Sequence, residues 1–193
     1  MFLAMGDAAK RIATYADLQA VPPHLVAELV DGELHTQSRP APKHGVAHSR
    51  LMGWSNSRFD VGDGGPGGWW ILLEPEIFFG SDVCVPDIAG WRKERMPRLK
   101  SSASFTIAPD WVCEVTSPAT ASFDRVKKMS VYARGGVKYA WLVSPIDRVL
   151  EAFELQNGAW MRVAAHGDDE RARIVPFEEV ELNLAWLWID IED

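Results

Sequence analysis

The sequence predicts a single domain in which helices pack against a β-sheet, an α/β or α+β fold. The chain has 193 residues, of which 47% are hydrophobic and 24% charged, and this composition suits one globular domain over residues 1–193. Its segments run in the order of early strands, then strand, helix and strand, then a hairpin. This order is typical of a sheet covered by helices.

The first third of the chain predicts a hairpin and a long helix. A short helix within 15–29 is interrupted by two consecutive prolines. The Asp-Gly pair at 31–32 favours the positive φ angles of a tight turn, so we expect a hairpin over 28–34. Apolar residues recur near helical spacing over 44–59, which predicts a helix, and the glycine-rich run 62–68 ends it.

The remaining segments predict strands around a second helix. Apolar runs favour strands over residues 69–79, 84–91 and 111–115. A helix follows over 123–134, and the glycine pair at 135–136 ends it. We expect further strands over 138–143, 149–155 and 160–164.

The net charge of the chain is −7, which by itself argues against a nucleic-acid partner. The acidic, Leu/Trp-rich tail 166–193 holds nine acidic and two basic residues, so residues 1–165 are balanced, with 18 of each sign. Within them, the stretch 92–100 carries five bases and one acid. The overall charge therefore neither supports nor excludes a polyanionic substrate, and 92–100 is a candidate contact for a nucleic-acid backbone.

Cysteine content and the absence of long apolar runs indicate a compartment. Two cysteines, Cys84 and Cys113, cannot make a disulfide framework, which favours a reducing cytoplasm. No apolar run approaches the ~20 residues of a membrane span, so we expect no membrane partner. The N-terminal residues 1–11 lack the charge order and cleavage site of a signal peptide.

Two acidic residues stand in segments whose neighbours are apolar. Asp87 follows Val-Pro and precedes Ile-Ala, and Glu114 lies within Val-Cys-Glu-Val. A buried carboxylate is costly unless it meets a cation, a metal or a proton. Either acid alone could equally face solvent from an edge strand. Two acids on neighbouring strands make a better case for a site that binds Mg²⁺ or Mn²⁺, because these ions prefer converging oxygen ligands.

A lysine falls inside the apolar arc of the helix predicted over 123–134. At about 100° per residue, Lys128 lies among the core-facing positions near Tyr132, whereas Lys127 faces solvent. Asp124 shares the face of Lys128. An inward lysine needs a carboxylate or a substrate anion to face, and the alternative is a lysine that snorkels from the edge of the arc.

Two acids and an inward lysine are the constellation of a metal-dependent phosphodiesterase. The metal polarises the scissile phosphate and lowers the pKa of the attacking water. The lysine can orient that water or stabilise the charge that develops on phosphorus. We therefore expect Asp87 and Glu114 to be metal ligands and Lys128 to be catalytic.

The ordered motifs resemble the Uma-type restriction endonuclease family, a branch of the PD-(D/E)XK nuclease superfamily. The resemblance covers about residues 25–155 and rests on Pro-Asp, then Glu-Val-Thr-Ser-Pro, then Asp-x-x-x-Lys, at 86–87, 114–118 and 124–128. Pro-Asp alone carries no signal, but the ordered combination is specific. The resemblance implies a restriction-endonuclease-like α/β fold, with a central mixed β-sheet flanked by helices, and Mg²⁺-dependent hydrolysis of phosphodiester bonds in double-stranded DNA.

The same resemblance implies catalytic roles for Glu28, Asp87, Glu114 and Lys128. Asp87 would be the central metal ligand, Glu114 the second, and Glu28 an additional acid before the hairpin. The superfamily lysine usually lies two residues after the second acid, where this chain has Thr116. The resemblance implies that the following helix supplies the lysine instead. It also implies a homodimer, because the superfamily often pairs two sites across a duplex.

A pair of histidines offers a rival metal site. His44 and His48 stand four residues apart on a predicted helix, a spacing that suits zinc. The zinc-peptidase motif needs a glutamate after the first histidine, and this chain has Gly45. We therefore interpret the pair as a helix-surface feature. We place His44 at most at the edge of a cleft, without a catalytic role.

The main alternative function is a non-catalytic, dimeric binding or regulatory module that keeps the nuclease fold, because fold does not determine function. All four candidate polar positions are present, which favours catalysis. Binding of a divalent metal at Asp87 and Glu114 would separate the two possibilities, since a binding module has no need of it.

Overall fold

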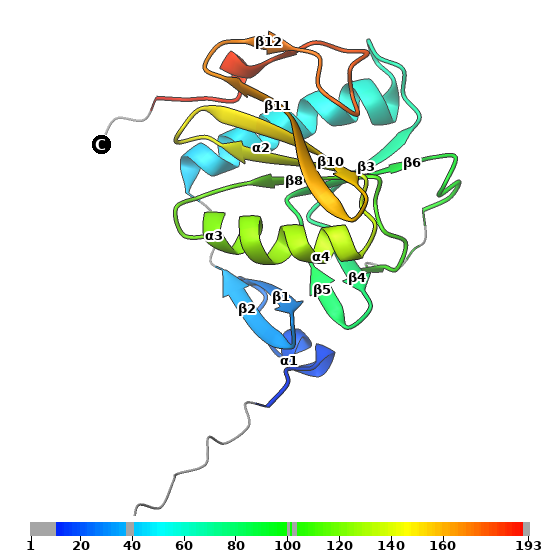
Figure 1. Ribbon diagram of the computed structural model, residues 1–193, viewed down its shortest axis with the longest axis vertical. Coiled ribbons are helices and arrows are strands. Elements are labelled where there is room, and N and C mark those ends of the chain that lie inside the picture. The colour runs from blue at the N-terminus through cyan, green and yellow to red at the C-terminus, as the bar shows by residue number, and fades with distance from the viewer. Residues whose placement is uncertain (1–10, 38–40, 100, 102–103, 191–193) are drawn as a thin grey trace, which may run out of the picture.

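The computed structural model describes residues 11–37, 41–99, 101 and 104–190. At its centre lies a six-stranded sheet with the strand order β11-β10-β9-β8-β6-β3 (Figure 1). Strands β8 and β9 pair in parallel, and the other neighbours in this sheet pair antiparallel. The strands are β3 (Trp69–Leu73), β6 (Ile88–Arg92), β8 (Trp111–Val115), β9 (Tyr139–Ser144), β10 (Val149–Gln156) and β11 (Ala159–Gly167). The predicted central mixed sheet is confirmed.

A second, smaller sheet lies beside the central one and has the order β2-β1-β5-β4-β7. Its strands are β1 (Val26–Val30), β2 (Glu33–Gln37), β4 (Glu76–Phe79), β5 (Asp82–Cys84) and β7 (Ser104–Phe105). The predicted hairpin is β1–β2, and its turn residues Asp31 and Gly32 have φ values of 52° and 76°. A short ribbon of β12 (Arg171–Ala172) and β13 (Leu182–Asn183) completes the strands of the described chain.

Two segments that we predicted as single strands each contribute to both sheets. The segment 69–79 divides into β3 and β4, and the segment 84–91 divides into β5 and β6. Each break contains a proline, Pro75 or Pro86, which has no N–H to donate to a strand ladder. The chain thus leaves the central sheet after β3, forms the β4–β5 hairpin and returns as β6. Asp87 consequently lies in the turn before β6 rather than within a strand.

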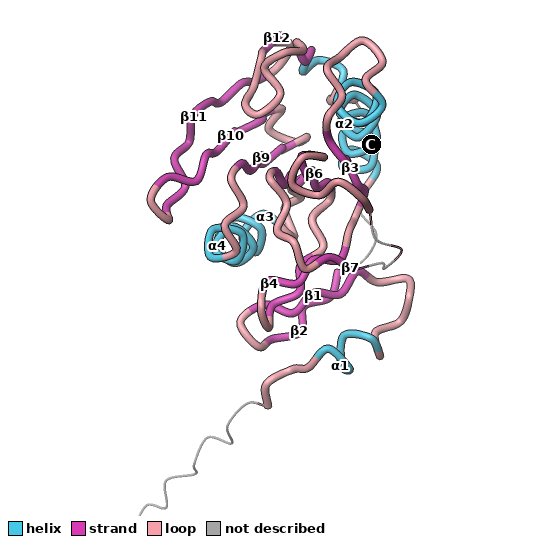
Figure 2. Tube along the Cα trace, turned by 90° about the vertical axis from the view of Figure 1, so that its right-hand side faces the viewer, coloured by secondary structure: helices cyan, strands magenta, loops and turns pink. Residues whose placement is uncertain are grey.

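Helices cover both faces of the central sheet, as predicted. Figure 2 shows α2 and α4 on opposite sides of it. On one side, α2 (Pro42–Ser55) continues into the π-helical turn η1 (Asn56–Val61). On the other, α3 (Ala121–Phe123), the π-helical turn η2 (Asp124–Lys128) and α4 (Met129–Arg134) follow without a break. The remaining helices of the described residues are α1 (Tyr15–Gln19) and the 3₁₀ turn η3 (Leu184–Trp186).

The alternation of β8 sends its side chains into two different cores. Trp111, Cys113 and Val115 pack with α2 and the C-terminal segment, whereas Val112 packs with α4 and the smaller sheet. Successive strand residues point to opposite faces, so Glu114 shares the face of Val112. The sheet register therefore directs a carboxylate at the helix that carries Lys128.

Some predictions made from the sequence concern residues that the structure does not describe. Residues 1–10, which include most of the segment that we judged not to be a signal peptide, are not described, and neither are Lys100 and the last three residues of the acidic tail. No helix in the described part of the chain is long and apolar enough to cross a membrane.

Candidate active site

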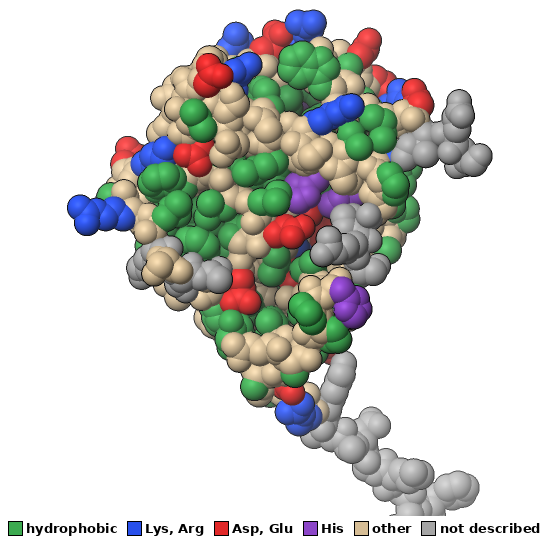
Figure 3. Space-filling view, turned by 180° about the vertical axis from the view of Figure 1, so that it is seen from behind, with side chains coloured by type: hydrophobic (Ala, Val, Ile, Leu, Met, Phe, Trp, Pro, Cys, Tyr) green, Lys and Arg blue, Asp and Glu red, His purple; other side chains and the backbone are tan. Residues whose placement is uncertain are grey.

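A cleft of about 760 Å³ opens where the smaller sheet, the start of α2 and the helix after β8 come together. Ligand sites in proteins have volumes of this order. In Figure 3, histidine and acidic side chains meet on one face of the molecule. Three of the four predicted catalytic residues line the cleft: Asp87, Glu114 and Lys128.

Asp87 is fixed at the cleft by its neighbours on β8 and α2. Its Oδ2 atom accepts a hydrogen bond of 2.7 Å from the backbone N–H of Val115, and its Oδ1 atom lies 3.4 Å from Nε2 of His44. Burial raises the pKa of Asp87, but hydrogen bonding to His44 and its charge outweigh burial, so the net pKa is lowered. Asp87 is therefore an ionised carboxylate.

Glu114 is held by two donors at one oxygen. Its Oε1 atom accepts a hydrogen bond from the hydroxyl of Tyr132 and lies 2.9 Å from Nζ of Lys128. Burial raises the pKa of Glu114 well above its usual value, and the Lys128 charge offsets this only in part. A carboxylate under this desolvation cost gains from any further cation that enters the cleft.

Lys128 is enclosed by oxygen atoms. Its Nζ atom lies 2.9 Å from Oε1 of Glu28, 2.9 Å from Oε1 of Glu114 and 3.1 Å from the carbonyl oxygen of Val85. Burial lowers the pKa of Lys128, but the charges of Glu114 and Glu28 more than reverse this and raise it well above 10.5. Lys128 is therefore a permanent cation and not a proton acceptor near neutral pH.

Glu28 lies behind Lys128 and is not among the residues that line the cleft. It is 0% exposed, and it accepts hydrogen bonds from the backbone N–H of Val85 at 2.7 Å and from Nε2 of Gln37 at 3.0 Å. The structure thus brings all four predicted residues together, but Glu28 reaches the cleft only through Lys128.

Sequence reasoning left three members of this network out of the site. Tyr132 donates to Glu114, Gln37 donates to Glu28, and Asp124 is 3% exposed and lines the cleft beside Lys128. Burial raises the pKa of Asp124 to about 6, although the Lys128 charge and a hydrogen bond from Thr120 act in the opposite direction. The helical positions of Asp124 and Tyr132 beside Lys128 were the available signal.

The interpretation of the two histidines as a helix-surface pair is wrong. His44 and His48 are 9% and 7% exposed, and both face Asp87. Nε2 of His48 lies 2.9 Å from the backbone carbonyl oxygen of Asp87. The reason is that the first two turns of α2 lie against Asp87, in the turn before β6, a tertiary contact that helical spacing alone does not reveal.

The cleft offers suitable donors for a divalent cation. Asp87 and Glu114 both line it. Within the described residues, Oε2 of Glu114 takes part in no hydrogen bond, because Tyr132 and Lys128 both contact Oε1. Free carboxylate oxygens of this kind are the ligands that Mg²⁺ and Mn²⁺ prefer. The residues therefore fit such an ion.

The sequence pattern of the Uma2 family, described as "Putative restriction endonuclease", matches residues 12–186. This chain belongs to the Uma2 family. A search of the curated proteins gave no match.

The fold of this Uma2 chain is similar to that of a solved structure from Anabaena variabilis, described as a "putative nuclease belonging to DUF820". The two chains share 24% sequence identity over 91% of this chain and 99% of the other, with a TM-score of 0.71. This agreement confirms the restriction-endonuclease-like α/β fold.

In this Uma2 chain, Thr116 and Lys128 make different contacts near Glu114. Thr116, two residues after Glu114, is 4% exposed, and its backbone N–H and hydroxyl both donate to the carbonyl oxygen of Val143, at 2.7 and 3.3 Å. Its hydroxyl is therefore directed at the backbone of β9. Lys128 on the following helix places its ammonium group at Glu114 instead.

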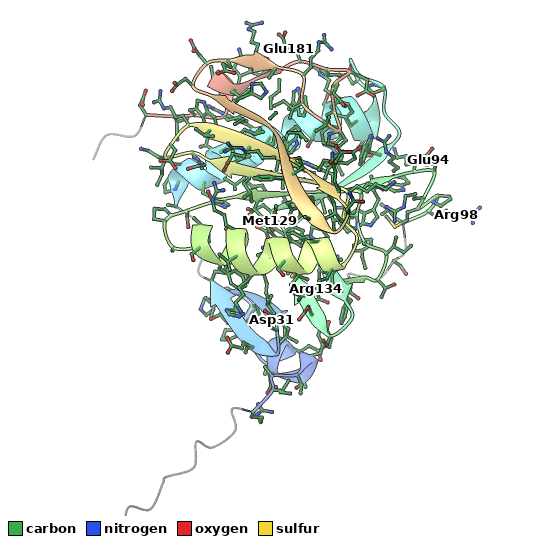
Figure 4. The ribbon with its side chains drawn as sticks, in the orientation of Figure 1. Asp31, Glu94, Arg98, Met129, Arg134 and Glu181 are labelled. Carbon is green, nitrogen blue, oxygen red and sulfur yellow. The ribbon has the colours of Figure 1, made fainter. Side chains whose placement is uncertain are left out.

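The described part of the basic stretch, 92–99, lies at the other end of β6 from Asp87, because Asp87 precedes that strand and the stretch begins at its last residue. Figure 4 labels Glu94 and Arg98 on this projecting loop. Lys93 lies 2.9 Å from Asp60, and Arg95 lies 2.8 Å from Asp110. Because these bases have partners in the fold, the stretch is a weaker candidate for DNA contact than its sequence indicated.

Proposed function

We propose that this Uma2 chain is a single-domain, Mg²⁺- or Mn²⁺-dependent endonuclease that hydrolyses phosphodiester bonds in double-stranded DNA. The observation that carries the proposal is the contact of 2.9 Å between Nζ of Lys128 and Oε1 of Glu114, made beside Asp87 in the wall of one cleft. Membership of the Uma2 family supports it.

Each polar residue has a defined task in this proposal. Asp87 and Glu114 would hold the cation, which supplies Lewis acidity to the scissile phosphate and lowers the pKa of the attacking water. Lys128, a permanent cation, stabilises the negative charge that develops on the phosphoryl oxygens. It does not take a proton from water, because its neighbouring carboxylates keep it protonated.

The residues behind the cleft keep these groups in place. Tyr132 fixes one oxygen of Glu114, which leaves the other to face the cation. Glu28 holds Lys128 from the side away from the cleft, and the N–H of Val85 holds Glu28 in turn. Such preorganisation matters because catalytic donors act only within a few tenths of an ångström of the productive geometry.

The partners and the compartment also belong to this proposal. We propose that the protein acts as a homodimer on its duplex, in the cytoplasm. The competing possibility is a regulatory module that keeps the same fold without catalysis.

Metal titration by calorimetry tests the proposal, with Mg²⁺ and Mn²⁺ added to the wild type in the presence and absence of a DNA duplex. We expect binding that is lost in Asp87→Asn and in Glu114→Gln. Asp82→Asn is the matched control, because Asp82 is a buried carboxylate that pairs with Arg134 outside the cleft.

Cleavage of plasmid DNA completes the test. We expect activity that EDTA abolishes, that Mg²⁺ or Mn²⁺ restores, and that Asp87→Asn and Lys128→Met each lower by at least about 100-fold, the scale of losing one group that stabilises charge in a transition state. Failure of the wild type to bind either metal at millimolar concentration with duplex present would favour the regulatory module. Cleavage that survives in Asp87→Asn would show that the metal site is misassigned.

A further inference from the structure

The two histidines of α2 are not used in the proposed hydrolysis, although both are buried at the cleft. His44 and His48 are one helical turn apart, so their rings leave the helix on the same side. Their ring centroids lie 5.8 Å apart, with an angle of 77° between the planes. The side chain of Asp87 faces His44 from the start of β6.

The hydrogen bond between His44 and Asp87 is a long one. The separation of 3.4 Å between Nε2 of His44 and Oδ1 of Asp87 exceeds that of most N–H···O hydrogen bonds, and Nδ1 of His44 makes no hydrogen bond of good geometry with the described residues. The Nε2 atom of His44 is therefore not held by a short hydrogen bond and is available to ligate an ion.

The separation of 3.4 Å is, by contrast, the spacing expected of two ligands that share one metal ion. Ligand atoms bound at about 2.1 Å from a metal lie roughly 3.0–3.4 Å from each other, for angles between 90° and tetrahedral. One ligand atom from each of His44, His48 and Asp87 can be chosen such that all three lie within 4.8 Å of one another. A small movement of the side chains would therefore bring three donors around one ion.

We propose that His44, His48 and Asp87 form a second cation site, selective for a divalent metal such as Zn²⁺ or Co²⁺. Two imidazole nitrogens and one carboxylate suit these ions, whereas Mg²⁺ prefers oxygen ligands alone. To bind through Nε2, His48 exchanges its hydrogen bond with the Asp87 carbonyl oxygen for the ion. The site rests on the proposed function only through Asp87, which both sites share.

The chain offers matched variants for testing this site. His44→Gln and His48→Gln keep a side-chain N–H donor but remove the imidazole ligand, so the hydrogen bond between residue 48 and the Asp87 carbonyl can survive. His35→Gln is the control, because His35 lines the same cleft but contacts Phe123 instead of Asp87. Glu114→Gln removes a ligand of the carboxylate site alone.

The experiment is a calorimetric titration of untagged protein with Zn²⁺ and Co²⁺, together with the visible absorption spectrum of bound Co²⁺. Thermal unfolding without metal shows that each variant is folded. We expect His44→Gln and His48→Gln each to weaken Zn²⁺ and Co²⁺ binding by about 10-fold or more and to change the Co²⁺ spectrum. His35→Gln and Glu114→Gln should bind these ions as the wild type does.

Two results overturn the second site: a wild type that binds neither ion, or unchanged affinity and an unchanged Co²⁺ spectrum in both histidine variants. A Mg²⁺ titration with duplex separates this inference from the proposed function. Mg²⁺ binding that is lost in Glu114→Gln but kept in His44→Gln, together with Zn²⁺ binding that is weakened in His44→Gln, supports both sites. Zn²⁺ binding that depends on the histidines, in a protein that does not bind Mg²⁺ with duplex, supports the histidine site and contradicts the proposed nuclease.

Discussion

The ammonium group of Lys128 lies 2.9 Å from Oε1 of Glu28, and the two side chains are only 2% and 0% exposed. Charges removed from water in this way are tolerated only when each has a well-placed partner. Glu28 also receives hydrogen bonds from Val85 and Gln37, so its position is fixed independently of Lys128. The pair therefore sets the place of the ammonium group at the inner wall of the cleft.

Glu28→Ala should lower the free energy of unfolding by about 3 kcal/mol, because it removes one of the two carboxylates paired with Lys128 and leaves the N–H of Val85 without its acceptor. Urea unfolding of the protein checks this value. Glu151→Ala is the control, since Glu151 pairs with Arg125 and Arg162, which are 44% and 60% exposed, and its loss should cost at most about 1 kcal/mol. Equal losses in the two variants would contradict the structural role assigned to Glu28.

Tyr132→Phe removes the hydroxyl that donates to Glu114 and keeps the buried ring. We expect it to weaken Mn²⁺ binding, because the hydrogen bond that fixes the orientation of Glu114 is removed, and to cost about 1–3 kcal/mol of stability. Tyr15→Phe is the matched control, since the Tyr15 hydroxyl donates to Glu76 at 2.8 Å outside the cleft. A Mn²⁺ affinity equal to that of the wild type would show that Tyr132 does not position Glu114.

Local signals in the sequence predicted much of the fold. The Asp-Gly pair at 31–32 produced the expected turn, and the chain reverses at Gly136, whose φ is 76°, at the end of α4. These features depend only on neighbouring residues. The division of 69–79 and 84–91 between two sheets depends on which strands pair with each half, and the prolines inside them were the only local sign of it.

The candidate site, too, could be predicted from the sequence only in part. Lys128 was identifiable because a lysine among apolar helix positions demands a partner, and the structure supplies Glu28 and Glu114. His44 and His48 were misinterpreted because helical spacing gives the face they share but not the element that covers it. A sequence shows which residues need partners more readily than it shows which partners they find.

Gly135→Ala should destabilise the protein by about 1–3 kcal/mol through overpacking. A Cβ atom at Gly135 would lie 2.2 Å from Cδ1 of Phe79, and the Phe79 ring packs against Tyr132 with centroids 5.6 Å apart. The displacement would therefore reach the residue that holds Glu114. Thermal and urea unfolding measure the loss.

The double variant Gly135→Ala with Phe79→Leu checks the cause, because a smaller side chain at 79 should recover part of the loss if the ring is the obstacle. Gly53→Ala is the control on α2, where a Cβ meets nothing within 4 Å, and it should stabilise the protein by about 0.5–1 kcal/mol. If the stability changes of the two single substitutions simply add in the double variant, the cause is something other than contact with Phe79.

Asp124 should give the stability a distinctive dependence on pH. Its pKa is about 6 in the folded protein, mainly through burial, against 3.8 for the unperturbed side chain. Between these two values the folded protein keeps a proton that the unfolded chain has lost, so Asp124 makes stability fall as pH rises. Below about pH 4 both states are protonated, and above about pH 6 the penalty is constant.

Asp124→Asn removes this titration, so its stability relative to the wild type should rise between pH 4 and pH 7 by roughly 2–3 kcal/mol, at about 1.4 kcal/mol for each unit of pKa. Urea unfolding in EDTA at several pH values measures the difference. Because the comparison is between pH values, any interaction that the substitution removes equally at every pH cancels. Asp147→Asn, at an exposed aspartate in the β9–β10 turn, should leave the slope unchanged. Parallel pH profiles for the wild type and Asp124→Asn would show that Asp124 is ionised in the folded protein throughout, with Lys128 as its sufficient counter-ion.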